Sequence, residues 1–261
     1  MRFFASISYN GSGFSGWQTQ RNAPSIQDEV QKALSTVIGE KIDVTGAGRT
    51  DTGVNASGFT AHFDFRDGSI LKEHDRIIYK TNAILPSNIV LNSFVRVRDD
   101  AHARFDATSR TYRYYIHSSK DPFAGQFSWF CKFPLDMDAM NEAAGMIIGR
   151  RDFSCFEKAG GTAATPVCDV TSAGWSRYTP STAILPGTDY LVFTITANRF
   201  LRNMVRAIVG TMVEIGRGRK SPEWMMSVLA SGSRCEAGQS VPGHALFLTG
   251  IEYPPEIFRY Q

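Results

Sequence analysis

The stretch RFFASISY, residues 2–9, opens the chain and predicts a β-strand. A helix is predicted from Ser25, because Asp28 three positions on completes a capping-box pattern. Its apolar residues recur at helical spacing, at Ile26, Val30, Ala33, Leu34 and Val37. The elements predicted next are a strand at about 42–46, an alternating strand that carries Phe59, Ala61, Phe63 and Phe65, a helix over about 70–82, and a strand at 89–97. The first part of the chain is therefore predicted to run β-α-β-β-α-β.

The rest of the chain predicts a similar order of elements. The expected strands lie at about 111–117, 167–177, 189–197 and 245–251, and the expected helices at 137–148, at 198–215 and from Ser221-Pro222 onward. Two consecutive units of this kind predict an α+β fold with two ferredoxin-like halves. The halves are expected to share one mostly antiparallel sheet with helices on one face and an active-site cleft between them. We place the boundary near residue 107, which gives halves 1–107 and 108–261.

Composition allows a folded protein with a sizeable core. The chain has 261 residues, 43% of them hydrophobic and 20% charged, and a net charge of +3, which permits a nucleic-acid partner without requiring one. Its four cysteines form no C-x-x-C pair and its five histidines show no ligand spacing, so we expect no metal site. Nothing in the cysteine pattern indicates a disulfide framework, which favours a reducing cytoplasm. The N-terminus has no signal-peptide pattern, and no segment has the apolar length of a membrane span.

The motif GAGRTDTGV, residues 46–54, places the carboxylate Asp51 between glycines and two positions after Arg49. Glycine lets the backbone approach a ligand closely, and a neighbouring arginine favours the ionised carboxylate. An ionised and positioned aspartate can act as a nucleophile or as a general base. A tight turn with a surface ion pair is the structural alternative.

The segment GRTD-x-GV resembles the signature of the TruA-type tRNA pseudouridine synthases, in which the aspartate is the catalytic nucleophile. The resemblance implies that role for Asp51. The usual pattern continues Ala-Gly-Val-His-Ala, whereas Thr52 and Asn55 stand here in place of the alanine and the histidine. Both departures follow the catalytic position, so they leave the nucleophile assignment intact and bear on local substrate contacts. The opening loop YNGSGFSGWQ, residues 9–18, resembles the same family and is expected to lie near the cleft.

The stretch ARFDATSRTYRYYI, residues 103–116, interleaves arginines and tyrosines along the predicted strand. Aromatic rings stack on unpaired bases and arginines bind phosphates. The structural alternative is a strand with Tyr112 and Tyr114 on the core face and the arginines outside, which is expected to hold for at least one of the tyrosines. This stretch also resembles the TruA-type family, whose tyrosine after the arginine lies over the target base. The resemblance assigns that position to Tyr112.

The stretch ANRFLRNMVRAIVG, residues 197–210, is predicted to be helical, with Arg199, Arg202 and Arg206 within about 60° of one another. Arg217 and Arg219 continue the positive charge, which favours a phosphate-binding surface over an ordinary solvated face. The core MVRAIVG resembles the family, whose arginine there pairs with the catalytic aspartate. The resemblance assigns that role to Arg206, while Arg199, Arg202, Arg217 and Arg219 form the predicted phosphate surface.

The resemblance covers the chain and implies isomerisation of uridine to pseudouridine at positions 38, 39 and 40 of the tRNA anticodon arm, by a homodimer and without a cofactor. The target base must leave its stack, and Tyr112 can recover part of that energy, roughly 1–3 kcal/mol, by stacking. Arg49 is expected to fill the vacated space or bind phosphate, and attack on the ribose or on the base remains open. The alternatives are a non-catalytic RNA-binding module and a carboxylate hydrolase, which would need a second acidic partner.

Overall fold

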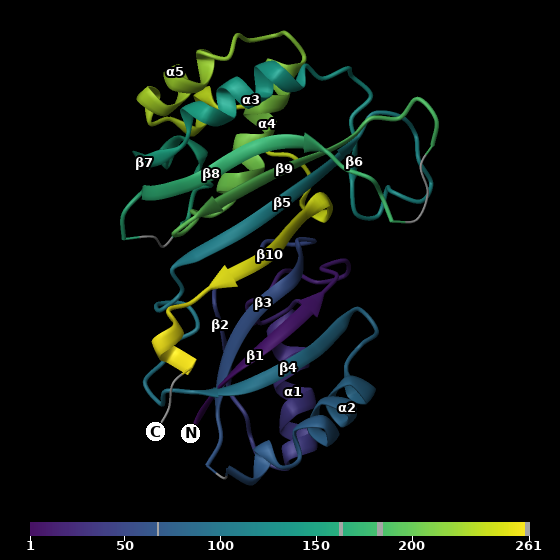
Figure 1. Ribbon diagram of the computed structural model, residues 1–261, viewed down its shortest axis with the longest axis vertical. Helices are drawn as coiled ribbons and strands as arrows, with labels where there is room; N and C mark the ends of the chain where they lie inside the picture. Colours follow the sequence, from purple (N-terminus) through teal and green to yellow (C-terminus); the bar gives the residue numbers. More distant parts are fainter. Residues whose placement is uncertain (67, 162–163, 182–184, 259–261) are drawn as a thin grey trace. The chain divides into compact units, whose positions relative to one another are not determined.

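The computed structural model describes residues 1–66, 68–161, 164–181 and 185–258 (Figure 1). Within these ranges the chain contains ten β-strands and five α-helices. It forms two compact units, of which unit 1 comprises Met1–Ser109 with the chain from Leu248 onward and unit 2 comprises Arg110–Phe247. None of the helices in the described ranges is long and apolar enough to cross a membrane.

Unit 1 follows the predicted order of elements. They are β1 (Arg2–Tyr9), α1 (Ile26–Ile38), β2 (Val44–Gly46), β3 (Asn55–Asp64), α2 (His74–Ile84) and β4 (Ile89–Val97). Strand β1 lies between β3 and β4 and is antiparallel to both, and β2 pairs antiparallel with β3. Strand β10 (Leu246–Glu252), which belongs to unit 1 from Leu248 onward, lies beside β3. The last strand of the sequence therefore joins the first unit, not the half 108–261 to which the boundary at residue 107 assigns it.

Helix α1 begins where its cap residue predicts. The Ser25 hydroxyl accepts a hydrogen bond from the Asp28 N–H at 3.2 Å and donates one to the Asp28 carboxylate at 2.6 Å. Such a cap contributes about 1 kcal/mol to helix stability. The helix ends at Ile38, and Gly39 after it caps the helix in the left-handed conformation with φ 85°. The predicted start of this helix is confirmed.

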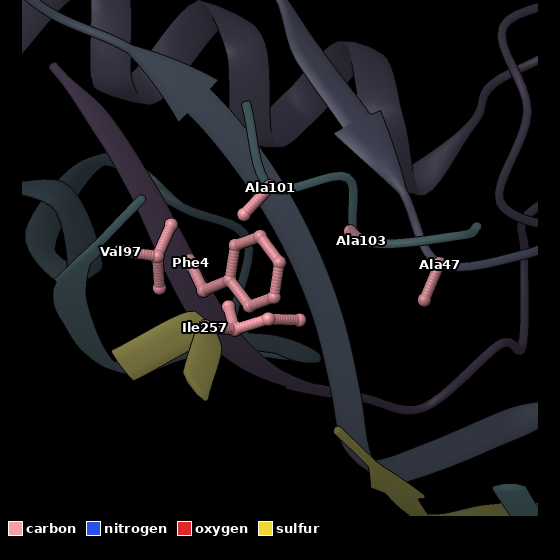
Figure 2. Packing of buried hydrophobic residues seen from close by; sticks show 6 residues of the cluster. All are labelled: Phe4, Ala47, Val97, Ala101, Ala103 and Ile257. Atoms are coloured by element: carbon pink, nitrogen blue, oxygen red, sulfur yellow. The ribbon is translucent and has the colours of Figure 1, made fainter. Parts of the chain in front are cut away.

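The alternating side chains of β1 bury aromatic rings on both faces of the sheet. Phe3 stacks on Phe63 at 5.4 Å between ring centroids and meets Phe94 edge to face at 5.9 Å. Phe4 points to the other face. There it lies in a buried cluster, shown in Figure 2, with Ala47, Val97, Ala101, Ala103 and Ile257. Because Ala47 is the second residue of the GAGRTD motif, this cluster ties the start of the motif to the core.

Unit 2 has a second antiparallel arrangement. Its elements are β5 (Ser109–His117), β6 (Trp129–Phe130), α3 (Met137–Met146), β7 (Gly149–Asp152), β8 (Val167–Arg177), β9 (Tyr190–Ala197), α4 (Met204–Gly216) and α5 (Trp224–Ser231). The strand order is β5-β9-β8-β7 with antiparallel neighbours, and the short β6 pairs parallel with β5. The predicted α+β class with mostly antiparallel strands is confirmed, whereas the ferredoxin-like description of each half remains a prediction.

Helix α4 starts six residues later than the sequence predicts. It begins at Met204, and Asn203 before it takes the left-handed conformation with φ 64°. Residues 198–202 are instead bound to other parts of unit 2, since the Asn198 N–H donates to Asp169 O at 3.0 Å and Arg202 O accepts from the Lys158 N–H at 3.0 Å. These contacts compete with the helical hydrogen bonds, and asparagine tolerates the left-handed turn that separates the two conformations. The prediction of one continuous helix from Asn198 was wrong.

Candidate active site

Asp51 lies on a tight turn in unit 1 between β2 and β3. The Val54 N–H donates to Asp51 O at 3.1 Å, and Gly53 takes φ 73° in the turn. A positive φ at the third residue alone is the signature of a type II turn. Asp51 is half-buried, while Arg49 and Thr52 are exposed. The turn therefore presents the half-buried Asp51 from a backbone fixed by its own hydrogen bond.

Two of the three tyrosines of β5, Tyr112 and Tyr114, differ in what they can contact. Tyr114 is fully buried and its hydroxyl donates to Pro242 O at 3.0 Å. Burial raises the pKa of Tyr114, against an opposing effect of the Arg206 charge. Tyr112, two residues away on the same face of the strand, is half-buried and meets Phe200 edge to face at 5.0 Å. Tyr114 is thus a core residue, as the structural alternative anticipated for at least one tyrosine, and of this pair Tyr112 is the one with an accessible surface.

Arg206 lies in the first turn of α4 and is held by the backbone of one neighbouring residue. Its Nε donates to Val241 O at 2.8 Å, and the Val241 N–H donates to Arg206 O at 3.2 Å. Bonding through Nε fixes the plane of the guanidinium group. The arginine therefore has a defined orientation within unit 2.

The segment Ser240–Pro242 organises this part of unit 2, and sequence reasoning missed it. Ser240 Oγ accepts from the Asn203 amide at 2.6 Å, Val241 holds Arg206, and Pro242 O accepts from Tyr114. The partners of these contacts are far apart in the sequence: 37 positions separate Asn203 from Ser240, 35 separate Arg206 from Val241, and 128 separate Tyr114 from Pro242. Two of the three acceptors are backbone carbonyls, so no side-chain pattern in the sequence identifies the segment.

The predicted basic face of α4 does not form. The helix is buried around most of its circumference and carries only two charged residues, Arg206 and Glu214. Helices that are apolar all round lie inside a core. Arg199 and Arg202 precede the helix, where Arg199 is half-buried and Arg202 is exposed and donates to Ala159 O at 3.2 Å. The prediction that Arg199, Arg202 and Arg206 share one face of a helix was wrong. A phosphate-binding role for Arg199 and Arg202 remains a prediction.

Arg217 and Arg219 at the end of α4 share one acidic partner. Both guanidinium groups bind Glu214, at 3.0 Å and 3.2 Å. The Arg217 side chain is only 13% exposed and its guanidinium lies 3.6 Å from the centroid of the Phe133 ring, whereas Arg219 is 56% exposed. Arg219 is therefore the better placed of the two to reach a phosphate.

The titratable residues elsewhere in the described ranges form no metal site, since no three histidine, cysteine, aspartate or glutamate side chains converge. The four cysteines are free, and burial raises the pKa of Cys155 to about 12 and of Cys168 to about 11. These two thiols are therefore protonated and unreactive at neutral pH.

Comparison with known proteins shows the relationship of the whole chain. Residues 143–254 match the family described as tRNA pseudouridine synthase. The chain is 46% identical to tRNA pseudouridine synthase A of Bacteroides fragilis over 98% of each chain. The chain belongs to the tRNA pseudouridine synthase A family. Proteins of the same name from Bacteroides thetaiotaomicron and Vibrio campbellii are 44% and 36% identical over 98% of this chain, and over 92% and 93% of their own lengths. Membership of the tRNA pseudouridine synthase A family thus extends over the Asp51 turn as well as the matched C-terminal part.

Proposed function

We propose that this chain isomerises uridine to pseudouridine at positions 38, 39 and 40 of the tRNA anticodon arm, with Asp51 as the nucleophile. Action on tRNA uridine follows from the family to which the chain belongs over nearly its whole length. The observation that supports Asp51 is its position: a half-buried carboxylate on a hydrogen-bonded turn within an intact GRTD motif. A carboxylate fixed in this way needs little reorganisation to attack.

The other site residues take complementary roles in this proposal. Tyr112 stacks on the flipped uracil with its accessible surface, supported at its edge by Phe200. Arg206, oriented by Val241, is the charge partner of Asp51. Arg49, exposed on the Asp51 loop, occupies the space that the base leaves or binds phosphate. No step requires a cofactor, because the bond broken at nitrogen is replaced by a bond at carbon of the same base.

The tRNA is proposed to be held by arginine contacts with its phosphates, from Arg199, Arg202 and Arg219 and to a smaller extent from the shielded Arg217. A homodimer in the cytoplasm, with the elbow and the anticodon arm bound by different subunits, completes the proposal. A non-catalytic RNA-binding role would not need the intact GRTD motif, and a hydrolase would need a second carboxylate near Asp51.

Release of tritium from tRNA labelled at uridine carbon 5 tests the function, because the carbon bond to ribose displaces that hydrogen. The wild-type chain should release tritium in proportion to pseudouridine formed. Asp51→Asn keeps the shape of the side chain and removes its charge, so it should abolish release while tRNA affinity stays within about tenfold. Activity of Asp51→Asn within about tenfold of wild type would remove Asp51 from the mechanism.

A further inference from the structure

A single segment of unit 1, residues Gly11–Trp17, contacts both ends of the Asp51 turn. We call this segment the cradle. At the near end the Trp17 N–H donates to Thr50 O at 3.3 Å. Tyr9, which precedes the cradle on β1, adds a hydrogen bond of 2.9 Å between its hydroxyl and Thr50 Oγ1, and Thr50 is only 7% exposed. The residue immediately before Asp51 is therefore held by backbone and side chain together.

At the far end the contact is made by Asn55, the first residue of β3. Asn55 is 1% exposed, and its Oδ1 accepts a hydrogen bond from the Gly11 N–H at 2.9 Å. The backbones on the two sides lie so close that a Cβ on Gly11 would be 2.3 Å from Val54 O, and a Cβ on Gly16 would be 2.2 Å from Thr50 O. Only glycine allows this approach at either point.

The cradle is itself anchored to the core. The first two N–H groups of α1, from Ile26 and Gln27, donate to Gly16 O at 3.2 Å and to Trp17 O at 3.0 Å. The Trp17 ring is 1% exposed and packs on Phe59 at 4.0 Å between centroids. Helix termini leave such N–H groups without intrahelical partners, so the cradle provides the hydrogen-bond acceptors for the start of α1 while it supports the Asp51 turn.

We propose that Asn55, through the cradle, and Tyr9, through its direct bond to Thr50, are positioning residues that fix the Asp51 carboxylate for attack. This inference rests on the proposed function and extends it to residues that touch neither base nor ribose. Asn55 fixes the far end of the turn and Tyr9 the near end, so loss of either contact lets Asp51 move relative to the substrate. Misplacement of a reacting group by about 1 Å lowers rates by up to about 100-fold, without a matching change in affinity.

The experiment compares Asn55→Leu with Asn55→His and with a matched control, Asn82→Leu. Leucine has the same number and branching of side-chain heavy atoms as asparagine and cannot accept the Gly11 N–H. Histidine, the usual residue at this place of the family signature, has a ring nitrogen that can accept it. Asn82 makes the same kind of bond in the same unit, since its Oδ1 accepts from the Leu91 N–H at 2.8 Å, but it lies on α2.

In single turnover with saturating tRNA, Asn55→Leu should be about 10- to 100-fold slower than wild type with nearly unchanged tRNA affinity. Asn55→His should recover most of the rate, and Asn82→Leu should lose stability but keep its rate. Tyr9→Phe retains the ring that packs near Trp17 and Phe59 and therefore keeps the fold, so it tests the near end if Asn55→Leu does not fold. It should also turn over more slowly. A wild-type rate in Tyr9→Phe and Asn55→Leu, or an equal loss in Asn82→Leu, would overturn the proposal.

Amide hydrogen exchange measured by mass spectrometry separates this inference from the proposed function. Exchange over residues 50–54 should be faster in Asn55→Leu than in wild type or Asn82→Leu, because the turn loses one of its anchors. Unchanged exchange would overturn only the inference that the cradle fixes the Asp51 turn. A wild-type chain that forms no pseudouridine would overturn the proposed function, and the catalytic meaning of the cradle with it.

Discussion

Thr211, in the middle of α4, links the stability of unit 2 to the orientation of Arg206. The residue is fully buried, and its Oγ1 donates to Ala207 O at 2.9 Å and accepts from the Gly238 N–H at 2.9 Å. Gly238 precedes the segment Ser240–Pro242, which holds Asn203, Arg206 and Tyr114. We expect Thr211→Val to loosen this segment without changing the shape of the helix.

The loss of unfolding free energy depends on whether the two hydrogen-bond partners of the Thr211 hydroxyl keep another partner in the variant. Ala207 O also accepts the helical N–H of residue 211, so it keeps a partner in the variant. The Gly238 N–H loses its acceptor in a buried position, which costs about 1–3 kcal/mol. Thr211→Ser keeps the hydroxyl and removes one methyl group, at about 0.5–1.5 kcal/mol. Valine should therefore be the more destabilising substitution, although it is the closer match in volume.

Urea unfolding followed by tryptophan fluorescence measures the difference, since Trp175 Nε1 lies 3.3 Å from Sδ of Met212, the next residue. Single-turnover rates on tRNA should fall in Thr211→Val and remain near wild type in Thr211→Ser. Equal destabilisation by the two variants, or a Thr211→Val protein within about 0.5 kcal/mol of wild type, would refute the reasoning.

Three further predictions concern catalysis, tRNA binding and acid stability. Tyr112→Phe keeps the ring and should lower turnover by about 100-fold with little change in tRNA affinity, which single-turnover and binding assays separate. Arg199→Ala should flatten the slope of log affinity against log salt by about 0.7–0.9, whereas Arg206→Ala should lower turnover and leave that slope nearly unchanged; a shift in the slope alone would place Arg206 on the phosphate surface. Burial lowers the pKa of His62 to about 4, so the unfolded chain binds a proton that the folded chain does not between about pH 6.5 and 4. As the pH falls through that window, the free energy of unfolding should decrease by on the order of 1–2 kcal/mol in wild type and by less in His62→Gln. An identical pH dependence of the urea midpoint in both proteins would contradict this.

The sequence alone determined the elements whose signals are local. The cap at Ser25 and the spacing of apolar residues behind it placed α1, and strands β1, β8 and β9 lie within a residue of their predicted ranges. A capping hydrogen bond joins residues three apart and a strand pattern repeats every two residues, so both are visible in a short window. The Asp51 motif was equally visible, because its glycines and its carboxylate lie within nine residues.

Tertiary structure decided what depends on distant partners. The helix was predicted to extend back to Asn198, but the hydrogen bonds that Asn198 donates to Asp169 O and that Arg202 O accepts from Lys158 hold that stretch outside α4. Tyr112 and Tyr114 fall on the same face of the predicted strand, so the sequence does not distinguish them, whereas in the structure Tyr114 is buried and Tyr112 only half-buried. Arg206 is held by the backbone carbonyl of Val241, and because every residue has a backbone carbonyl, neither composition nor spacing could predict this contact. Local periodicity fixes which elements form, while packing against segments that are remote in sequence within the same unit fixes where the elements end and which side chains remain accessible to a ligand.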